Sequence, residues 1–193
     1  MQFELFIEGH YIDLERFTDN HISELESIAL DARIWENLPN NITDKISFYS
    51  YIKDLQIKNL SNQQVTYVIR NKTNKQVCGS TGFVNIDAVN QQLEIGTTWL
   101  SPNVWGTKIN IESKYLLLVQ CFEKQHLIRV GFKTRETNIR SQKAIEKIGG
   151  IREGLLRCYR KNEDGTFRNS IVYSIIQPEW PSTKISLEVL IHK

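Results

Sequence analysis

The chain has 193 residues, of which 40% are hydrophobic and 24% charged, a composition typical of an ordinary globular protein. Aromatic residues make up 10% of the chain, which excludes intrinsic disorder over most of its length. The 24 lysines and arginines and 22 aspartates and glutamates give a formal net charge of +2, so charge provides no argument for a nucleic-acid or membrane partner.

The N-terminal part of the chain predicts an extended segment followed by two helices. Residues 7–16 are expected to be extended, with Gly9 at a bend. Thr18 is a candidate N-cap of a first helix, whose apolar stripe is Ile22, Leu25, Ile28 and Ala29. Thr43 is a candidate N-cap of a second helix, whose stripe is Ile46, Tyr49, Ile52 and Leu55.

Three strands are predicted next, over residues 64–70, 77–87 and 93–100. In the first of them Val65, Tyr67 and Ile69 share one face. A polar turn over residues 71–76 joins the first strand to the second. The short spacings predict an antiparallel meander.

The C-terminal part predicts a helix over 109–124, a strand over 127–134 and a helix over 138–148 that Gly149 and Gly150 end. Residues 151–160 and 167–176 flank the tetrapeptide Asn162-Glu163-Asp164-Gly165, which predicts a β-hairpin with an Asp-Gly turn. A meander combined with a βαβ unit indicates an α+β fold with a mixed central β-sheet flanked by helices. No linker is visible, so we expect a single domain over residues 1–181 and a C-terminal tail over 182–193.

The cysteines and histidines form no metal-binding pattern. Cys78, Cys121 and Cys158 are widely spread, which predicts three buried thiols in a reducing compartment and neither a disulfide framework nor a zinc site. The four histidines have no metal-ligand spacing, so no metal is expected. No signal peptide or apolar run of about 20 residues is visible, and we expect a cytoplasmic location with no membrane contact.

The segment from Ser101 to Lys108 connects a predicted strand to a predicted helix. Such a loop presents free backbone N–H groups at a helix N-terminus, which together with the helix dipole form a site suited to phosphate. Gly106 would let a ligand approach the backbone closely, or it would only relieve a tight turn.

Four segments in this order resemble the GNAT acyltransferase superfamily, and within it the Rim-type branch, which acetylates protein N-termini including those of ribosomal proteins. They are Leu93-Glu94-Ile95-Gly96-Thr97-Thr98-Trp99-Leu100, Trp105-Gly106-Thr107, Thr137-Asn138-Ile139-Arg140-Ser141 and Ile148-Gly149-Gly150. The resemblance covers about residues 5–181. It implies an N-acetyltransferase domain that uses acetyl-CoA as cosubstrate and whose third and fourth main strands splay apart around the thioester arm.

The resemblance also implies a set of cofactor-binding residues. The Thr98 N–H would face the thioester carbonyl, the N–H groups of residues 104–109 would hold the pyrophosphate, and Asn138 would contact the pantetheine arm. The implied set is Thr98, Trp99, Leu100, Val104, Trp105, Gly106, Thr107, Lys108, Ile109 and Asn138. This sequence differs from the family's Gln/Arg-x-x-Gly-x-Gly/Ala signature at Asn103 and at Lys108. The ammonium of Lys108 would either point to solvent or reach a CoA phosphate.

Glu94 is the candidate catalytic base. It aligns with the strand glutamate that serves as base in some relatives, and strand alternation places it opposite Leu93 and Ile95, where partial burial would raise its pKa. An exposed glutamate, one tied to a neighbouring lysine or arginine, and a base acting through a water chain remain open. Ser141 is the candidate acid or hydrogen-bond donor on the sulfur side, or it only satisfies N–H groups in the first helical turn.

Two further residues have alternative interpretations. Asn138 caps its helix, contacts the cofactor, or does both. Trp35 lies in the region that forms one wall of the acceptor groove in this family, so it either helps to bind substrate or belongs to the core.

These observations predict an enzyme that moves an acetyl group from acetyl-CoA directly to a primary amine, with a protein or peptide N-terminus as the favoured acceptor. A non-catalytic acyl-CoA-binding module and an acetyltransferase of small amines such as polyamines or aminoglycosides are the alternatives. An acidic acceptor groove would favour the cationic small amines. The expected assembly is a monomer or homodimer.

Overall fold

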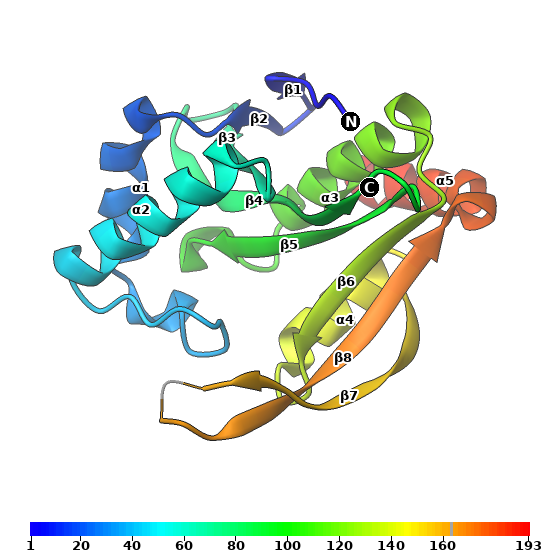
Figure 1. Cartoon of the computed structure of the whole chain (residues 1–193). Helices are drawn as coiled ribbons and strands as arrows, with labels where there is room; N and C mark the ends of the chain where they lie inside the picture. Colours follow the sequence, from blue (N-terminus) through cyan, green and yellow to red (C-terminus); the bar gives the residue numbers. More distant parts are fainter. Residues whose placement is uncertain (163) are drawn as a thin grey trace.

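The computed structural model describes residues 1–162 and 164–193, so Glu163 of the predicted hairpin turn lies outside the described residues. The described chain contains one mixed eight-stranded sheet in the order β1-β2-β3-β4-β5-β6-β8-β7 (Figure 1). Its strands are β1 (Phe6–Glu8), β2 (Ile12–Arg16), β3 (Gln64–Asn71), β4 (Val77–Asp87), β5 (Gln92–Leu100), β6 (Arg129–Arg135), β7 (Ile151–Lys161) and β8 (Phe167–Ile176). The predicted α+β class, meander and hairpin are confirmed.

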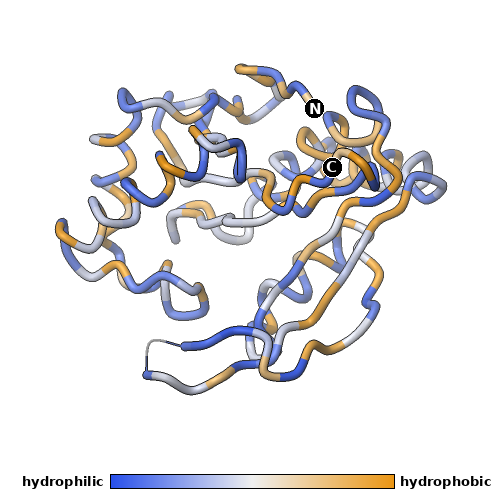
Figure 2. Tube along the Cα trace, in the orientation of Figure 1, coloured by the Kyte–Doolittle hydropathy of each residue, from blue (hydrophilic) through white to orange (hydrophobic). Residues whose placement is uncertain are grey.

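Helices cover both faces of the sheet. They are α1 (Ile22–Ala29), α2 (Lys45–Leu60), α3 (Ile109–Val119), α4 (Ile139–Lys147) and α5 (Trp180–His192), and a π-helical turn over Gln120–Lys124 extends α3. One apolar core lies between the sheet and α3, α4 and α5, and a second lies between the sheet and α1 and α2. Alternation along β3 serves both, because Val65, Tyr67 and Ile69 enter the first core and Val68 the second. Figure 2 shows hydrophobic residues recurring along the strands and helices.

Three sequence predictions about local structure are wrong. Helix α2 is capped by Asp44, whose carboxylate accepts a 2.8 Å hydrogen bond from the Ser47 N–H, and not by Thr43. Its buried stripe is Phe48, Ile52 and Leu55, while Ile46 is 83% exposed, because the helix packs by a face rotated from the predicted one. Cys158 is exposed, since it lies at an irregularity of β7 with a φ of 51°.

Residues 182–193, expected as a tail, form most of helix α5. Trp180, Leu187 and Ile191 are buried in the first core, and Trp180 stacks on Phe122 with a centroid distance of 5.3 Å. Helical spacing of these apolar residues gives the segment a face that packs on α3, so the core continues past residue 181.

Strands β5 and β6 separate soon after they meet. They are parallel neighbours, but only Gln92, Leu93 and Glu94 pair with Arg129, Val130 and Gly131. Beyond Glu94 the two strands diverge and leave a V-shaped opening in the middle of the sheet (Figure 1). This confirms the splayed strands that the resemblance implies, and it gives β5 an edge without a strand partner.

Candidate active site

A cleft with a volume of about 980 Å³ lies at the opening between β5 and β6. The segment after α1, the loop before α3, the first turns of α4 and the β7–β8 hairpin complete its walls. A cleft of this size at a break in a sheet is a typical small-molecule site.

The loop before α3 brings backbone N–H groups to the cleft. Gly106 has a φ of 75°, and a Cβ there would meet nothing within 4 Å, so glycine serves the left-handed backbone and not a close approach. The N–H groups of Gly106, Lys108 and Asn110 have no acceptor among the described residues. Val104, Trp105, Gly106 and Thr107 line the cleft, so a helix N-terminus with free N–H groups faces it. Helix N-termini of this kind are suited to anions.

Two residues of the predicted cofactor set do not line the cleft, Lys108 and Ile109. The Lys108 ammonium donates a 3.2 Å hydrogen bond to the Tyr11 hydroxyl and lies over that ring, 5.2 Å from its centroid. The structure therefore directs this half-buried side chain to Tyr11 and not into the cleft. The buried Glu112 carboxylate fixes the same end of α3, because it accepts the N–H groups of Tyr11 and Ile12 at 2.9 and 3.2 Å.

A β-bulge shapes β5 beside the cleft. Gly82 pairs with Gly96 and Ser80 with Trp99, so Thr81 alone opposes Thr97 and Thr98. Thr97 has a φ of 51°, the left-handed conformation that one type of bulge uses. The Thr98 hydroxyl lies 2.8 Å from that of Thr81, and the bulge determines which way Thr98 faces.

Lys114 hydrogen-bonds to both strands of this bulge, and the sequence analysis did not identify it as a site residue. The side chain lies on α3, lines the cleft floor and is 7% exposed as a residue. Its ammonium donates to the hydroxyls of Thr81, at 2.8 Å, and Thr98. Burial lowers the pKa of Lys114 to about 7. The signal in the sequence was a lysine at helical spacing within the apolar stripe of Ile111 and Leu118.

Glu94 lies at the point where β5 and β6 part. Its side chain is 20% exposed, and its Oε1 accepts a 2.6 Å hydrogen bond from the Lys133 ammonium. Lys133 also donates to the Tyr159 hydroxyl at 3.1 Å. Burial opposes the charge on Lys133, but the bonds to Glu94 and Tyr159 outweigh it and raise the pKa of Lys133. The structure thus bears out the interpretation of Glu94 as tied to a lysine and places the pair at the cleft.

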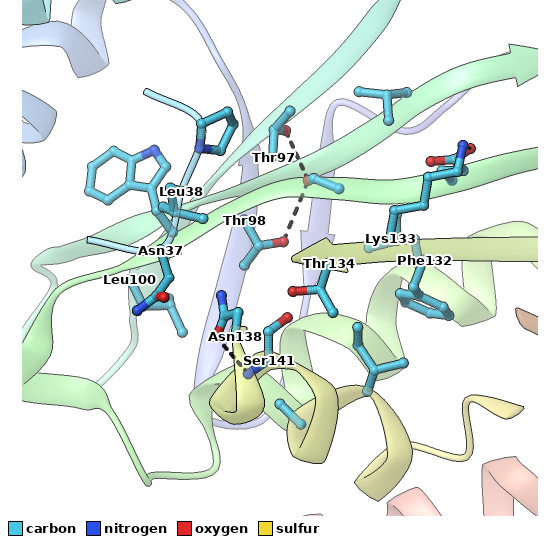
Figure 3. Close-up of a pocket in the computed structure, with 18 of the residues that line it drawn as sticks. Asn37, Leu38, Thr97, Thr98, Leu100, Phe132, Lys133, Thr134, Asn138 and Ser141 are labelled. Carbon is cyan, nitrogen blue, oxygen red and sulfur yellow. Dashed lines mark hydrogen bonds and ion pairs between the residues drawn. The ribbon is translucent and has the colours of Figure 1, made fainter. Parts of the chain in front are cut away.

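Asn138 and Ser141 lie opposite β5 at the start of α4 (Figure 3). The Asn138 side chain accepts a 3.0 Å hydrogen bond from the Ser141 N–H, which confirms the predicted N-cap. Both residues line the cleft, and the Ser141 hydroxyl has no partner among the described residues. Figure 3 shows this hydroxyl directed toward the side where Thr134 lies. A hydrogen-bond donor is therefore available on the α4 side of the cleft.

Trp35 is both a core residue and a cleft residue. It is 4% exposed, its indole N–H donates to the Ala29 carbonyl at 2.6 Å, and its ring lies 5.3 Å from that of Trp99. Both tryptophans also line the cleft, together with Leu100. The two interpretations of Trp35 are thus compatible.

Arg140 of α4 contacts Trp105 of the loop before α3. Its guanidinium carbon lies 3.8 Å from the centroid of the indole, a close cation–π contact between two walls of the cleft.

The described residues include no helix long and apolar enough to span a membrane. Nor do they bring together a set of histidine, cysteine, aspartate and glutamate side chains that could hold a metal ion.

Residues 12–151 match the family described as acetyltransferase (GNAT) domain. YdaF of Bacillus subtilis strain 168, named as a ribosomal N-acetyltransferase, is 30% identical over 113 residues, or 56% of this chain. The matched stretch spans 58% of YdaF, which is less than two thirds of its length.

The fold of this chain is similar to that of solved structures over almost its whole length. A crystal structure of an acetyltransferase from T. thermophilus has a TM-score of 0.90 and 30% identity, and the match covers 99% of each chain. Mycobacterium smegmatis RimJ in complex with CoA-disulfide has a TM-score of 0.78 and 21% identity, covering 93% of this chain and 88% of RimJ, which shows the shared fold.

Proposed function

The chain belongs to the GNAT acetyltransferase family, and from this premise we propose that it transfers the acetyl group of acetyl-CoA directly to a primary amine, with a protein or peptide N-terminus as acceptor. The observation that carries the proposal is the joining of an anion-binding helix N-terminus to a carboxylate-bearing cleft between splayed strands. YdaF is named for ribosomal acetylation, which supports a protein acceptor.

The residues present fit acetyl-CoA. The unpaired N–H groups before α3 suit its pyrophosphate, and the free edge of β5 suits the amide-bearing pantetheine arm. Asn138 and Ser141 offer polar groups on the opposite wall. When bound, acetyl-CoA supplies the activated acyl group. The contact between Arg140 and Trp105 links the α4 wall to the loop before α3.

The chain's own groups then meet the needs of amide formation. An α-amino group with a pKa of about 7.7–8.0 must lose a proton before it attacks, and Glu94 accepts it directly or through water. Among the described residues Glu94 is paired through Oε1 alone, so its second oxygen is available for this hydrogen bond. Thr98, fixed by Thr81 and Lys114, presents its N–H to the developing negative charge. Ser141 donates a hydrogen bond on the thiol side.

A panel of amines tests the proposal. The full-length chain is incubated with acetyl-CoA and either peptides with a free N-terminus, spermidine, or an aminoglycoside, and released thiol is measured with the mass of the product. Acetylation of the peptide N-terminus is expected. Turnover of only the small amines would contradict the protein acceptor, and calorimetric binding of acetyl-CoA without turnover on any amine would contradict the reaction.

Gly106→Glu tests the placement of the cofactor. The change puts a side chain on a backbone with φ of 75° and adds negative charge where phosphate is expected to bind, so the Kd for acetyl-CoA should rise by about 30-fold, or about 2 kcal/mol. Isothermal titration measures it. Gly106→Asn is the matched control, because asparagine tolerates positive φ and is neutral. An unchanged affinity for acetyl-CoA in Gly106→Glu would show that the cofactor phosphates do not bind at this loop.

A further inference from the structure

Three arginines line the hairpin side of the cleft. Arg135 ends β6 and pairs with Ser170 of β8, and two residues further along β8 Arg168 pairs with Arg160 of β7. Residues paired across strands, and residues two apart along a strand, share one face of a sheet. The three guanidinium groups therefore lie on one face, which we call the arginine wall (Arg135, Arg160 and Arg168).

The arginine wall faces away from the cofactor loop. Asn138, Ser141 and the loop before α3 belong to the α3–α4 side of the sheet. Arg135 instead donates a 3.1 Å hydrogen bond to the carbonyl of Leu38, in the segment between α1 and α2. The wall thus borders the cleft on the side of Trp35 and Leu38, and Figure 2 shows hydrophilic chain along the outer part of β7 there.

No carboxylate of the described residues pairs with these arginines. The Nε atoms of Arg135 and Arg168 are buried without a hydrogen-bond partner, although buried polar atoms normally have one. Burial lowers the pKa of Arg168, and the charges of Arg135 and Arg160 lower it further. Neighbouring cations without an anion cost free energy in the empty protein, and an anionic ligand would relieve that cost.

The excess of basic residues in the whole cleft also favours an anionic ligand. Besides the buried Lys114, seven lysine and arginine side chains and two carboxylates are among its described lining residues, although the chain as a whole has a net charge of only +2. Both carboxylates are already paired, Asp54 with Lys58 at 2.5 Å and Glu94 with Lys133 at 2.6 Å. A polyamine or aminoglycoside would meet repulsion here and find no free acid.

We propose that the arginine wall is a subsite for carboxylates of the acceptor, so that the preferred substrate is a peptide whose N-terminal segment is acidic. The proposal rests on the proposed function and adds the acceptor's class to it. A cationic surrounding also favours the neutral form of a bound amine, which is the form that attacks.

Strand geometry predicts which acceptor residues reach the wall. Lys133, the partner of Glu94, pairs with Val172, which lies four residues from Arg168 along β8, a separation of about 13 Å at about 3.3 Å per residue. An extended peptide with its amine at Glu94 covers this distance in about four residues. Acidic side chains at positions 3 to 5 of the acceptor are therefore the ones expected to matter.

Three peptides of one length test the proposal. All begin with serine, and positions 3 to 5 are glutamate, glutamine or arginine, the last because a guanidinium is not an acetyl acceptor. The kcat/KM is expected to fall by about tenfold from the glutamate to the glutamine peptide, and again to the arginine peptide, with smaller ratios at high salt. Equal rates, or a preference for the arginine peptide, would overturn the proposal.

Matched variants locate the effect. Arg160→Gln and Arg168→Gln should each reduce the glutamate-to-glutamine ratio about threefold without changing the KM for acetyl-CoA. Arg157→Gln, which removes the same charge from an exposed position of β7 outside the cleft lining, should leave the ratio unchanged. A raised KM for acetyl-CoA in Arg168→Gln would assign the wall to the cofactor and overturn the proposal.

A binding measurement separates this proposal from the proposed function. Affinities of the CoA-loaded protein for the three fluorescent peptides do not depend on turnover. If no peptide is acetylated but the glutamate peptide still binds about tenfold more tightly than the glutamine peptide, the anionic subsite stands and the proposed reaction fails. If the three peptides bind equally, the subsite is refuted whatever the protein acetylates.

Discussion

Replacing Glu94 with glutamine is expected to lower kcat by about 10²–10⁴ while the affinity for acetyl-CoA stays the same. Glutamine keeps the shape of the side chain, and its carbonyl still accepts the bond from Lys133, but it takes up no proton from the attacking amine. Steady-state kinetics with a peptide acceptor and calorimetry with acetyl-CoA measure the two quantities.

Lys133→Met distinguishes a base from a structural counter-ion. If Glu94 serves only to neutralise Lys133, removing either partner should harm activity alike. If Glu94 takes the proton, Lys133→Met leaves the carboxylate in place and should lower kcat by less than about tenfold. Turnover of Glu94→Gln near the wild-type rate would exclude Glu94 from proton transfer and indicate water or another carboxylate.

Lys114→Met is expected to lower kcat by about 10² with little change in the KM for acetyl-CoA. Lys114 acts as a positioning residue, because its ammonium ties Thr98 to Thr81 across the bulge, and a displacement of about 1 Å in a reacting geometry costs about that factor. Lys124→Met is the control, because it removes a lysine from an exposed position. A kcat within threefold of wild type would refute the positioning role.

Stability measurements give Lys114 a second, independent readout. Its pKa falls from 10.5 to about 7 on folding, so between these values the unfolded chain binds more protons than the native protein. The free energy of unfolding of the wild type should therefore rise with pH over this window, relative to Lys114→Met, by up to about 1.4 kcal/mol per pH unit. Urea unfolding of both proteins at pH 7 and pH 9.5 measures the difference, and parallel pH dependences would contradict a buried lysine.

Features that depend on neighbours in the chain were predictable. Alternation predicted β3, β4 and β5, the Asn138 side chain was identified as a helix cap, and Gly149 with Gly150 ended α4 where expected. The loop between β5 and α3 was expected from a strand, a glycine and a helix in succession. Periodicity, capping and turn chemistry act over a few residues, so a single sequence contains their signals.

Other features depend on which distant segments meet. The sequence left Glu94 as an exposed, paired or buried carboxylate, and the tertiary structure decided for a pair because β6 brings Lys133 to it from 39 residues away. The arginine wall depends on tertiary structure in the same way, since Arg135, Arg160 and Arg168 come together only through the pairing of β6, β7 and β8.

The sequence by itself determined the α+β class, most of the elements and the presence of a loop between a strand and a helix. Each of these depends on the periodicity, capping and turn residues of a short stretch of chain. Only the tertiary structure decided that residues 182–192 belong to a packed helix, that the Lys108 ammonium hydrogen-bonds to Tyr11, and that Lys114 is buried beside Thr98. The reason is physical: burial, charge pairing and pKa shifts are set by the groups that folding brings within a few ångströms, and those groups lie far apart in the sequence.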